Sequence, residues 1–346
     1  MKHIRALASL VALIALAPVA GQAATPVRVE QGSLIYDGIP LDAVAAPSTL
    51  PRWLESRSAG FVDWLADGSI LITTRFGNSA QLHRVRAPLG MREQLTFDAE
   101  PITSAVANPH NASQLLYRKD MGGNENTQIW LRDLATFTDR LLTDGKSRYD
   151  APVLSHDGQR LAFAGNQRDG VSSDIYLRDL AGEAQPRLLL AGGNEALSVE
   201  DWSLDDRRLA VVRYRSSTDS ELLLVDAGSG VQTRIEPAMA PVAAGRKKGA
   251  AVAATAGVVS VGSARFSRDG RGLYFTSDRG GEFIGLYYMD LYTQQLTAQT
   301  PDTPWDVERF ALSDDGHYLA YTRNEGGIDR LVLRDLLQKA DVLLPA

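Results

Sequence analysis

One unit recurs six times along the 346-residue chain and constrains its fold more than any other feature. Each copy holds an apolar strand, a turn of the type Ser-x-Asp-Gly, a Leu-Ala-Phe-like strand and a polar loop, followed by an Ile-Tyr-Leu-Arg-Asp-Leu-like strand and a short apolar run. The two clearest copies begin at Val153 and at Leu312. The polar residue of the turn falls at Asp67, Asn111, Asp157, Asp205, Asp269 and Asp315.

The spacing of these turns predicts the architecture. Successive turn residues lie 44, 46, 48, 64 and 46 residues apart, so four of the five gaps keep nearly one period. Four short strands in a unit of this length are typical of a β-propeller blade, because radial stacking then buries both faces of every sheet. The chain is therefore predicted to be an all-β propeller of about six four-stranded blades, or an incomplete seven-bladed one. The repeats are predicted at about 59–97, 102–144, 150–191, 198–237, 258–300 and 306–346.

Two segments fall outside this period. The long gap contains an Ala-, Gly- and Val-rich stretch of low complexity, which predicts an inserted loop at 238–257. Residues 24–58 precede the first repeat and are predicted to be an N-terminal extension or a closing strand. In the second case Gly32 to Tyr36 would pair with the last repeat and remove an exposed sheet edge.

Residues 1–23 have the pattern of a signal peptide. Lys2 and Arg5 give a basic start, Ala6 to Ala17 is an uncharged apolar run, and small residues follow up to Ala24. The run is shorter than the ~20 residues that span a bilayer. We therefore expect an exported protein, periplasmic or secreted, with no membrane span once the signal is cleaved.

Composition excludes several classes of function. The chain has no cysteine, which rules out disulfides, thiolate catalysis and cysteine metal sites. Its formal net charge is −6, and it becomes more negative when Lys2 and Arg5 leave with the signal peptide. Because such a surface repels phosphate backbones, nucleic acid is not an expected partner.

Three stretches are more specific than the general repeat. They are Arg118 to Trp130, Thr276 to Phe283, and Arg57 to Trp64. In these stretches the chain resembles the N-terminal propeller of the prolyl oligopeptidase family of serine peptidases, in its dipeptidyl or acyl-aminoacyl branch. It is more distantly similar to TolB-like propellers, which share the Ser-x-Asp-Gly and Asp-Leu elements. The resemblance covers essentially all of the mature chain.

The resemblance implies a function in peptide binding. In that family the propeller caps an α/β-hydrolase domain and admits short or unfolded peptides to an enclosed cavity. The implied partners are therefore a peptide or protein ligand and a separate hydrolase domain. The sequence contains no Gly-x-Ser-x-Gly nucleophile elbow, and the repeats end near Ala346, where the family continues into a final blade and the hydrolase. We expect no catalytic, cofactor-binding or metal-binding residues, and no enzyme activity of this chain alone.

Five residues are candidates for peptide binding, because loops at the ends of propellers carry binding. Glu125 and Asn126 stand beside a Gly-Gly pair in the second repeat, and Asp278, Arg279 and Glu282 lie in the fifth. The resemblance implies that an acidic residue of the first group pairs with the amino end of a peptide by a charge-assisted hydrogen bond. The alternatives are a solvated turn for the first group and salt bridges within the blade for the second.

Other polar residues have structural interpretations. We expect His83 on an exposed strand face and His110, His156 and His317 in surface turns. Acidic clusters such as Asp201 with Asp205 and Asp206 are predicted to be solvated turns. The recurring pairs are predicted to be scaffold, with the aspartate capping a turn: Arg132-Asp133, Arg178-Asp179 and Arg334-Asp335.

Two functional hypotheses follow. In the first, the chain is the gate portion of a prolyl-oligopeptidase-type peptidase, truncated before its hydrolase domain, and it binds or channels peptides without cleaving them. In the second, it is a free-standing TolB-like periplasmic propeller that acts as a protein-interaction platform.

Overall fold

The computed structural model describes residues 28–31, 34–38, 57–102, 104–235, 258–279, 281–300 and 303–344, and every regular element within them is a β-strand. The predicted signal peptide and the inserted loop at 238–257 lie outside these ranges. The chain divides into two compact units, Met1–Glu55 and Ser56–Ala346.

The described residues of the first unit form a pair of antiparallel strands. Strand β1 (Val29–Gln31) pairs with β2 (Leu34–Tyr36) in a two-stranded sheet. Strand β2 lies in the segment expected to pair with the last repeat, and within its own unit it pairs with β1. Pairing across a short turn costs much less loop-closure entropy than pairing across about 300 residues.

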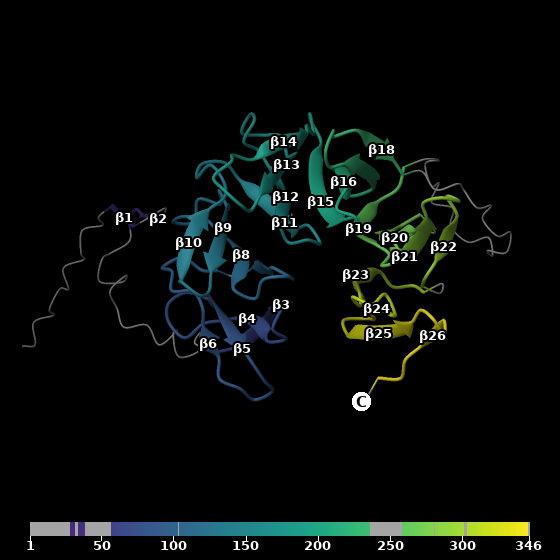
Figure 1. Ribbon diagram of the computed structural model, residues 1–346, viewed down its shortest axis with the longest axis horizontal. Coiled ribbons are helices and arrows are strands. Elements are labelled where there is room, and N and C mark those ends of the chain that lie inside the picture. Colours follow the sequence, from purple (N-terminus) through teal and green to yellow (C-terminus); the bar gives the residue numbers. More distant parts are fainter. Residues whose placement is uncertain are drawn as a thin grey trace, which may run out of the picture. The chain divides into compact units, whose positions relative to one another are not determined.

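The second unit is a β-propeller of six four-stranded antiparallel blades in chain order, which confirms the predicted fold (Figure 1). Within each blade every strand pairs with the one that follows it in sequence. The strands of blades 1 to 3 are β3 (Ala59–Trp64), β4 (Ile70–Thr74), β5 (Gln81–Val85) and β6 (Glu93–Gln94); β7 (Ala105–Ala107), β8 (Gln114–Lys119), β9 (Gln128–Asp133) and β10 (Thr138–Leu141); and β11 (Tyr149–Leu154), β12 (Arg160–Gly165), β13 (Asp174–Asp179) and β14 (Arg187–Leu190).

Blades 4 to 6 repeat the same pattern with longer second and third strands in blade 4. Their strands are β15 (Ala196–Trp202), β16 (Arg208–Ser216), β17 (Asp219–Asp226) and β18 (Gln232–Arg234); β19 (Val261–Phe266), β20 (Gly272–Ser277), β21 (Gly285–Asp290) and β22 (Leu296–Ala298); and β23 (Val307–Leu312), β24 (Tyr318–Asn324), β25 (Asp329–Asp335) and β26 (Ala340–Asp341).

The Ser-x-Asp-Gly motif closes the turn between the first two strands of a blade. In blade 3 the Ser155 Oγ–H donates to the Asp157 carboxylate at 2.5 Å, and the same oxygen accepts the Arg160 N–H at 2.9 Å. Gly158 has a φ of 67°, a conformation that glycine adopts without steric cost. The same serine-to-aspartate bond recurs in blades 4, 5 and 6, which explains why the motif marks the repeat.

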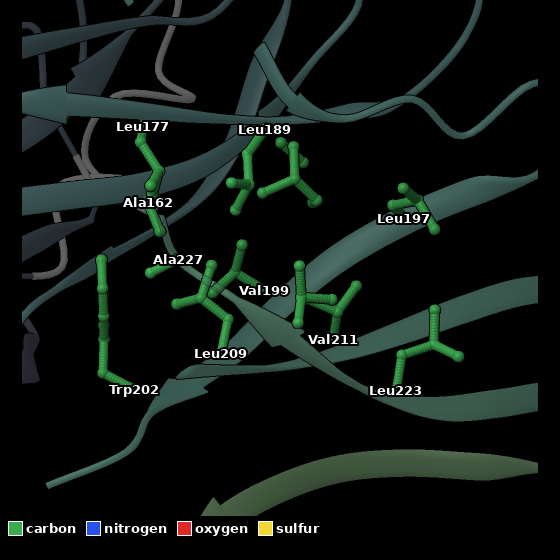
Figure 2. Close-up of a cluster of buried hydrophobic side chains, with 13 residues drawn as sticks. Ala162, Leu177, Leu189, Leu197, Val199, Trp202, Leu209, Val211, Leu223 and Ala227 are labelled. Atoms are coloured by element: carbon green, nitrogen blue, oxygen red, sulfur yellow. The ribbon is translucent and has the colours of Figure 1, made fainter. Parts of the chain in front are cut away.

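Apolar side chains fill the spaces between neighbouring blades. Figure 2 shows the cluster between blades 3 and 4, in which Leu177 and Leu189 of blade 3 pack with Trp202 and Leu209 of blade 4. Trp202 is fully buried, and its indole N–H donates to the Val153 carbonyl at 3.0 Å. Equivalent clusters join blade 1 with 2, blade 2 with 3, blade 4 with 5 and blade 5 with 6. Burial between blades is therefore the main stabilising contribution to this unit.

The two end blades each keep one face uncovered. The last residue of the innermost strand packs on the preceding blade in blades 2 to 6, but its counterpart in blade 1, Trp64, is 63% exposed. On blade 6, Leu331 and Leu343 occupy the positions of the buried Ile175 and Leu189 and are 56% and 96% exposed. No packing of comparable extent joins strands of blade 6 to strands of blade 1 in the described part of the chain.

Candidate functional site

The connections of each blade divide between two ends of the propeller. The turns between first and second strands lie at one end, and the loops between second and third strands lie at the other, which we call the loop end. All five predicted site residues are at the loop end: Glu125 and Asn126 between β8 and β9, and Asp278, Arg279 and Glu282 between β20 and β21. No hydrogen bond or ion pair of the described residues joins the two groups.

Glu125 lies in a self-contained turn of blade 2. Its N–H donates to the Asp120 carboxylate at 2.9 Å, and its φ of 60° lies in the left-handed region. The neighbouring Asn126 N–H donates to the Asn124 side-chain oxygen at 3.0 Å. These contacts belong to the backbone of the turn and leave the Glu125 side chain exposed. The pairing of this carboxylate with a peptide ammonium stays a prediction.

The three candidates of blade 5 have separate environments. The Asp278 carboxylate accepts the Ser260 N–H at 2.8 Å, and Glu282 is exposed. Arg279 is partly buried, and burial lowers the pKa of its guanidinium. No ion pair joins Arg279 to either acid among the residues that the structure describes. The alternative interpretation, a salt bridge within the blade, is therefore wrong for these residues.

The innermost strands carry acidic residues that sequence reasoning missed as a group. Five of the six innermost strands, all but β7, shift register against their neighbour, and in blade 4 this irregularity falls between Val199 and Asp201. Such bulges re-aim side chains. The Asp201 carboxylate accepts the Phe266 N–H of blade 5 at 2.8 Å. At the same position of blade 1, Asp63 accepts the Ala107 N–H of blade 2 at 2.9 Å.

Burial shifts the titration of these acids. It raises the pKa of Asp63, and it also raises the pKa of Glu200 and Asp201. Positive charges on Arg265 partly offset the effect at both residues of blade 4. The prediction that Asp201 belongs to a solvated turn is wrong, because its carboxylate is held between two blades.

This arrangement predicts a pH-dependent effect of Asp201→Asn. A carboxyl whose pKa is raised by folding costs stability at pH 7, and that cost disappears as the pH falls through the raised pKa toward the usual value. Asparagine keeps an oxygen that accepts the Phe266 N–H and carries no charge. The variant is therefore expected to unfold at a higher urea concentration than the parent at pH 7, with the difference closing toward pH 4. A constant difference between pH 7 and pH 4 would contradict this account.

Polar side chains also meet across blades at the turn end. Asp206, which is 7% exposed, accepts the His156 N–H at 2.7 Å. Arg268 reaches the His156 ring at 3.3 Å and the Asp314 carboxylate at 3.1 Å. The His110 ring contacts the His156 carbonyl at 2.5 Å. These residues therefore link blades 2 to 6, and the prediction of Asp206 as a solvated turn residue is wrong.

Two further interpretations concern His83 and the recurring Arg-Asp pairs. His83 is 1% exposed, so its predicted place on an exposed strand face is wrong; the ring packs against Phe76 at 5.3 Å between centroids. The Arg-Asp pair of blade 2 is part of the scaffold, as predicted. Asp133 caps its turn by accepting the Ala135 N–H at 2.8 Å. Arg132 donates to the Leu95 carbonyl of the preceding blade at 2.9 Å.

The described residues contain neither a metal-ion cluster nor a helix that could span a membrane. No group of three histidine, cysteine or acidic side chains is placed to hold a metal ion. Among the same residues, no helix has the length and apolar character needed to cross a membrane.

No family model and no curated protein sequence matches the chain. Solved structures do share the fold. The oligogalacturonate lyase of Vibrio parahaemolyticus superposes with a TM-score of 0.63 at 14% identity, covering 84% of this chain and 79% of the lyase. A prolyl endopeptidase matches with a TM-score of 0.63 at 12% identity, covering 88% of this chain but only 46% of the peptidase. TolB of Acinetobacter baumannii matches with a TM-score of 0.51 at 19% identity, covering 80% and 60%. The predicted likeness to peptidase and TolB propellers is confirmed at the level of the fold.

Proposed function

We propose that this chain is an exported, non-catalytic propeller that binds unfolded peptides, in the manner of the gate of a prolyl-oligopeptidase-type serine peptidase. A separate hydrolase domain is its proposed partner in that role. The observation that carries the proposal is the innermost strand of blade 1. Strand β3 pairs with β4 on one side only, and its Phe61 and Trp64 are 61% and 63% exposed.

Such a strand suits a peptide for two reasons. An unpaired strand edge offers backbone N–H and C=O groups to an extended chain, which gives affinity without strict sequence preference. The rings of Phe61 and Trp64 lie with centroids 6.0 Å apart in an edge-to-face arrangement and offer apolar contact to a side chain of the ligand. A folded protein presents few extended segments of this kind, so the edge favours unfolded ligands.

The test uses a fluorescein-labelled, leucine-rich octapeptide without proline and measures its anisotropy with the full chain. The double substitution Phe61→Ser and Trp64→Ser is expected to weaken binding about tenfold or more, which corresponds to about 1.4 kcal/mol. Tyr292→Ser is the control, because Tyr292 is 78% exposed on the turn between β21 and β22. The labelled peptide is expected to remain intact throughout.

Two results would contradict the proposal. One is equal affinity of the double variant and the Tyr292→Ser control. The other is cleavage of the peptide that persists in chromatographically pure protein. Tight binding of folded envelope proteins without peptide binding would favour the TolB-like platform instead, since the uncovered faces of blades 1 and 6 also suit a protein partner.

A further inference from the structure

Arg279 differs from the other partly buried arginines of the propeller. Five arginines that the structure describes have a buried Nε with no hydrogen-bond partner: Arg132, Arg178, Arg213, Arg268 and Arg279. The first four use other guanidinium nitrogens, in ion pairs, in bonds to backbone carbonyls or in a contact with a histidine ring. Within the described part of the chain, no hydrogen bond or ion pair of the Arg279 guanidinium is found. A partly buried cation without a partner is costly to the fold and calls for an explanation.

The repeat reveals what Arg279 lacks. The residue that pairs with the position of Gly165, at the end of the second strand, is polar in four blades: Gln128, Asp174, Glu221 and Arg330. In blade 5 this position, opposite Ser277, is Gly285. Among blades 2 to 6, blade 5 is therefore the one without a polar side chain at this place.

Blade 3 demonstrates the arrangement that blade 5 leaves incomplete. Its loop arginine, Arg168, donates to the Asp174 carboxylate through Nε at 2.7 Å and Nη2 at 3.2 Å. Asp174 is the counterpart of Gly285. The corresponding loop of blade 5 keeps the arginine and loses the carboxylate. A planar guanidinium pairs best with a carboxylate, which it binds through two parallel bonds.

The surroundings of Arg279 do not supply a substitute. Asp278 is the neighbouring acid, but its carboxylate accepts the Ser260 N–H. Hydroxyl groups lie near the vacated position: a Cβ at Gly285 would stand 3.3 Å from the Tyr287 Oη and 3.4 Å from the Thr300 Oγ1. Burial is the largest effect on the Arg279 guanidinium and lowers its pKa, while Tyr287 and Asp278 act in the opposite direction.

We propose that Arg279 is an anion site that binds one carboxylate group of the ligand, in the place that the Asp174 carboxylate takes in blade 3. The identification of this carboxylate as the carboxyl end or an acidic side chain of a peptide rests on the proposed function. The site consists of the Arg279 guanidinium and of the space that the absence of a side chain at Gly285 leaves.

The experiment uses N-acetyl-alanine as a single-carboxylate probe and N-acetyl-alaninamide as its uncharged counterpart, titrated calorimetrically into the full chain. The acid is expected to bind at least about tenfold more tightly than the amide. Arg279→Gln should abolish this preference. Arg271→Gln is the matched control, because Arg271 is an exposed arginine of the same blade and should leave the preference unchanged.

A second variant keeps the test decisive if Arg279→Gln changes the loop. Gly285→Asp restores the carboxylate of blade 3, and the chain has no positive φ at Gly285 that would oppose a side chain. The Tyr287 ring must shift by a few tenths of an ångström, since its Cε2 lies 3.2 Å from the new Cβ. In this variant the introduced carboxylate is expected to bind the Arg279 guanidinium. The variant should therefore melt at a higher temperature than the parent and lose the preference for the acid.

The outcomes separate this inference from the proposed function. Equal binding of acid and amide by the parent, or a preference that survives in both variants, would overturn the anion site. If the octapeptide binds with its carboxyl end free or amidated alike, and Arg279→Gln has no effect, the anion site is wrong while the peptide function stands. If the acid binds through Arg279 but no peptide binds, the anion site stands and the peptide function is wrong.

Discussion

Replacing Trp202 by alanine is expected to lower the free energy of unfolding by about 3–5 kcal/mol, whereas the same change at Trp64 should cost less than about 1 kcal/mol. The two tryptophans end the innermost strands of blades 4 and 1, and each follows an aspartate that binds the next blade. Trp202 is fully buried against blade 3, and Trp64 is 63% exposed. Alanine therefore leaves a cavity at the first site and none at the second.

Urea unfolding followed by circular dichroism measures both variants, and the dependence of the free energy on urea should stay unchanged. The pair tests the uncovered face of blade 1 as well as the core. If Trp64→Ala costs as much as Trp202→Ala, another element covers Trp64 in solution, and the exposed aromatic pair proposed to bind peptides is not available.

Replacing Asp174 by alanine is the second large effect that we expect, a loss of about 3 kcal/mol. The Asp174 side chain is fully buried and accepts the Gly192 N–H at 2.8 Å as well as the Arg168 guanidinium. Alanine leaves a buried N–H without an acceptor and a guanidinium without its carboxylate. Because the Arg168 side chain is 38% exposed, it is partly rehydrated, which keeps the loss at the lower end of the range for buried pairs.

Asp329→Ala is the control, at the first residue of the third strand of blade 6. Asp329 is exposed and accepts one bond from the Asn324 side chain at 2.9 Å, so its replacement should change stability by about 0.5 kcal/mol or less. The urea midpoints of the two variants, compared with that of the parent, measure both losses of stability. Similar losses at both positions would show that the burial of Asp174 is not what makes it important.

Local sequence determined the blades, because each strand and turn depends on residues close to it. Alternating apolar residues define the strands, and the serine and aspartate of each turn bond to one another two residues apart. The loop positions of Glu125 and Arg279 followed from the same repeat. Two of the wrong interpretations share one cause. Asp201 and Asp206 are polar residues next to turns, and their carboxylates bind backbone groups of a neighbouring blade 50 or more residues away. His83 is instead buried against Phe76 of its own blade.

The sequence by itself determined the number of blades, the turn chemistry and the blade and loop that carry Arg279. Only the tertiary structure decided which of two equivalent tryptophans is buried and which arginine lacks a carboxylate. The physical reason is that turns are closed by bonds between residues a few positions apart, whereas burial and ion pairing depend on what the adjacent blade and strand place opposite each side chain. Trp64 and Trp202 have the same local sequence context, and Arg168 and Arg279 lie in corresponding loops. Their environments differ because of a neighbouring blade in the first case and of a single glycine on the facing strand in the second.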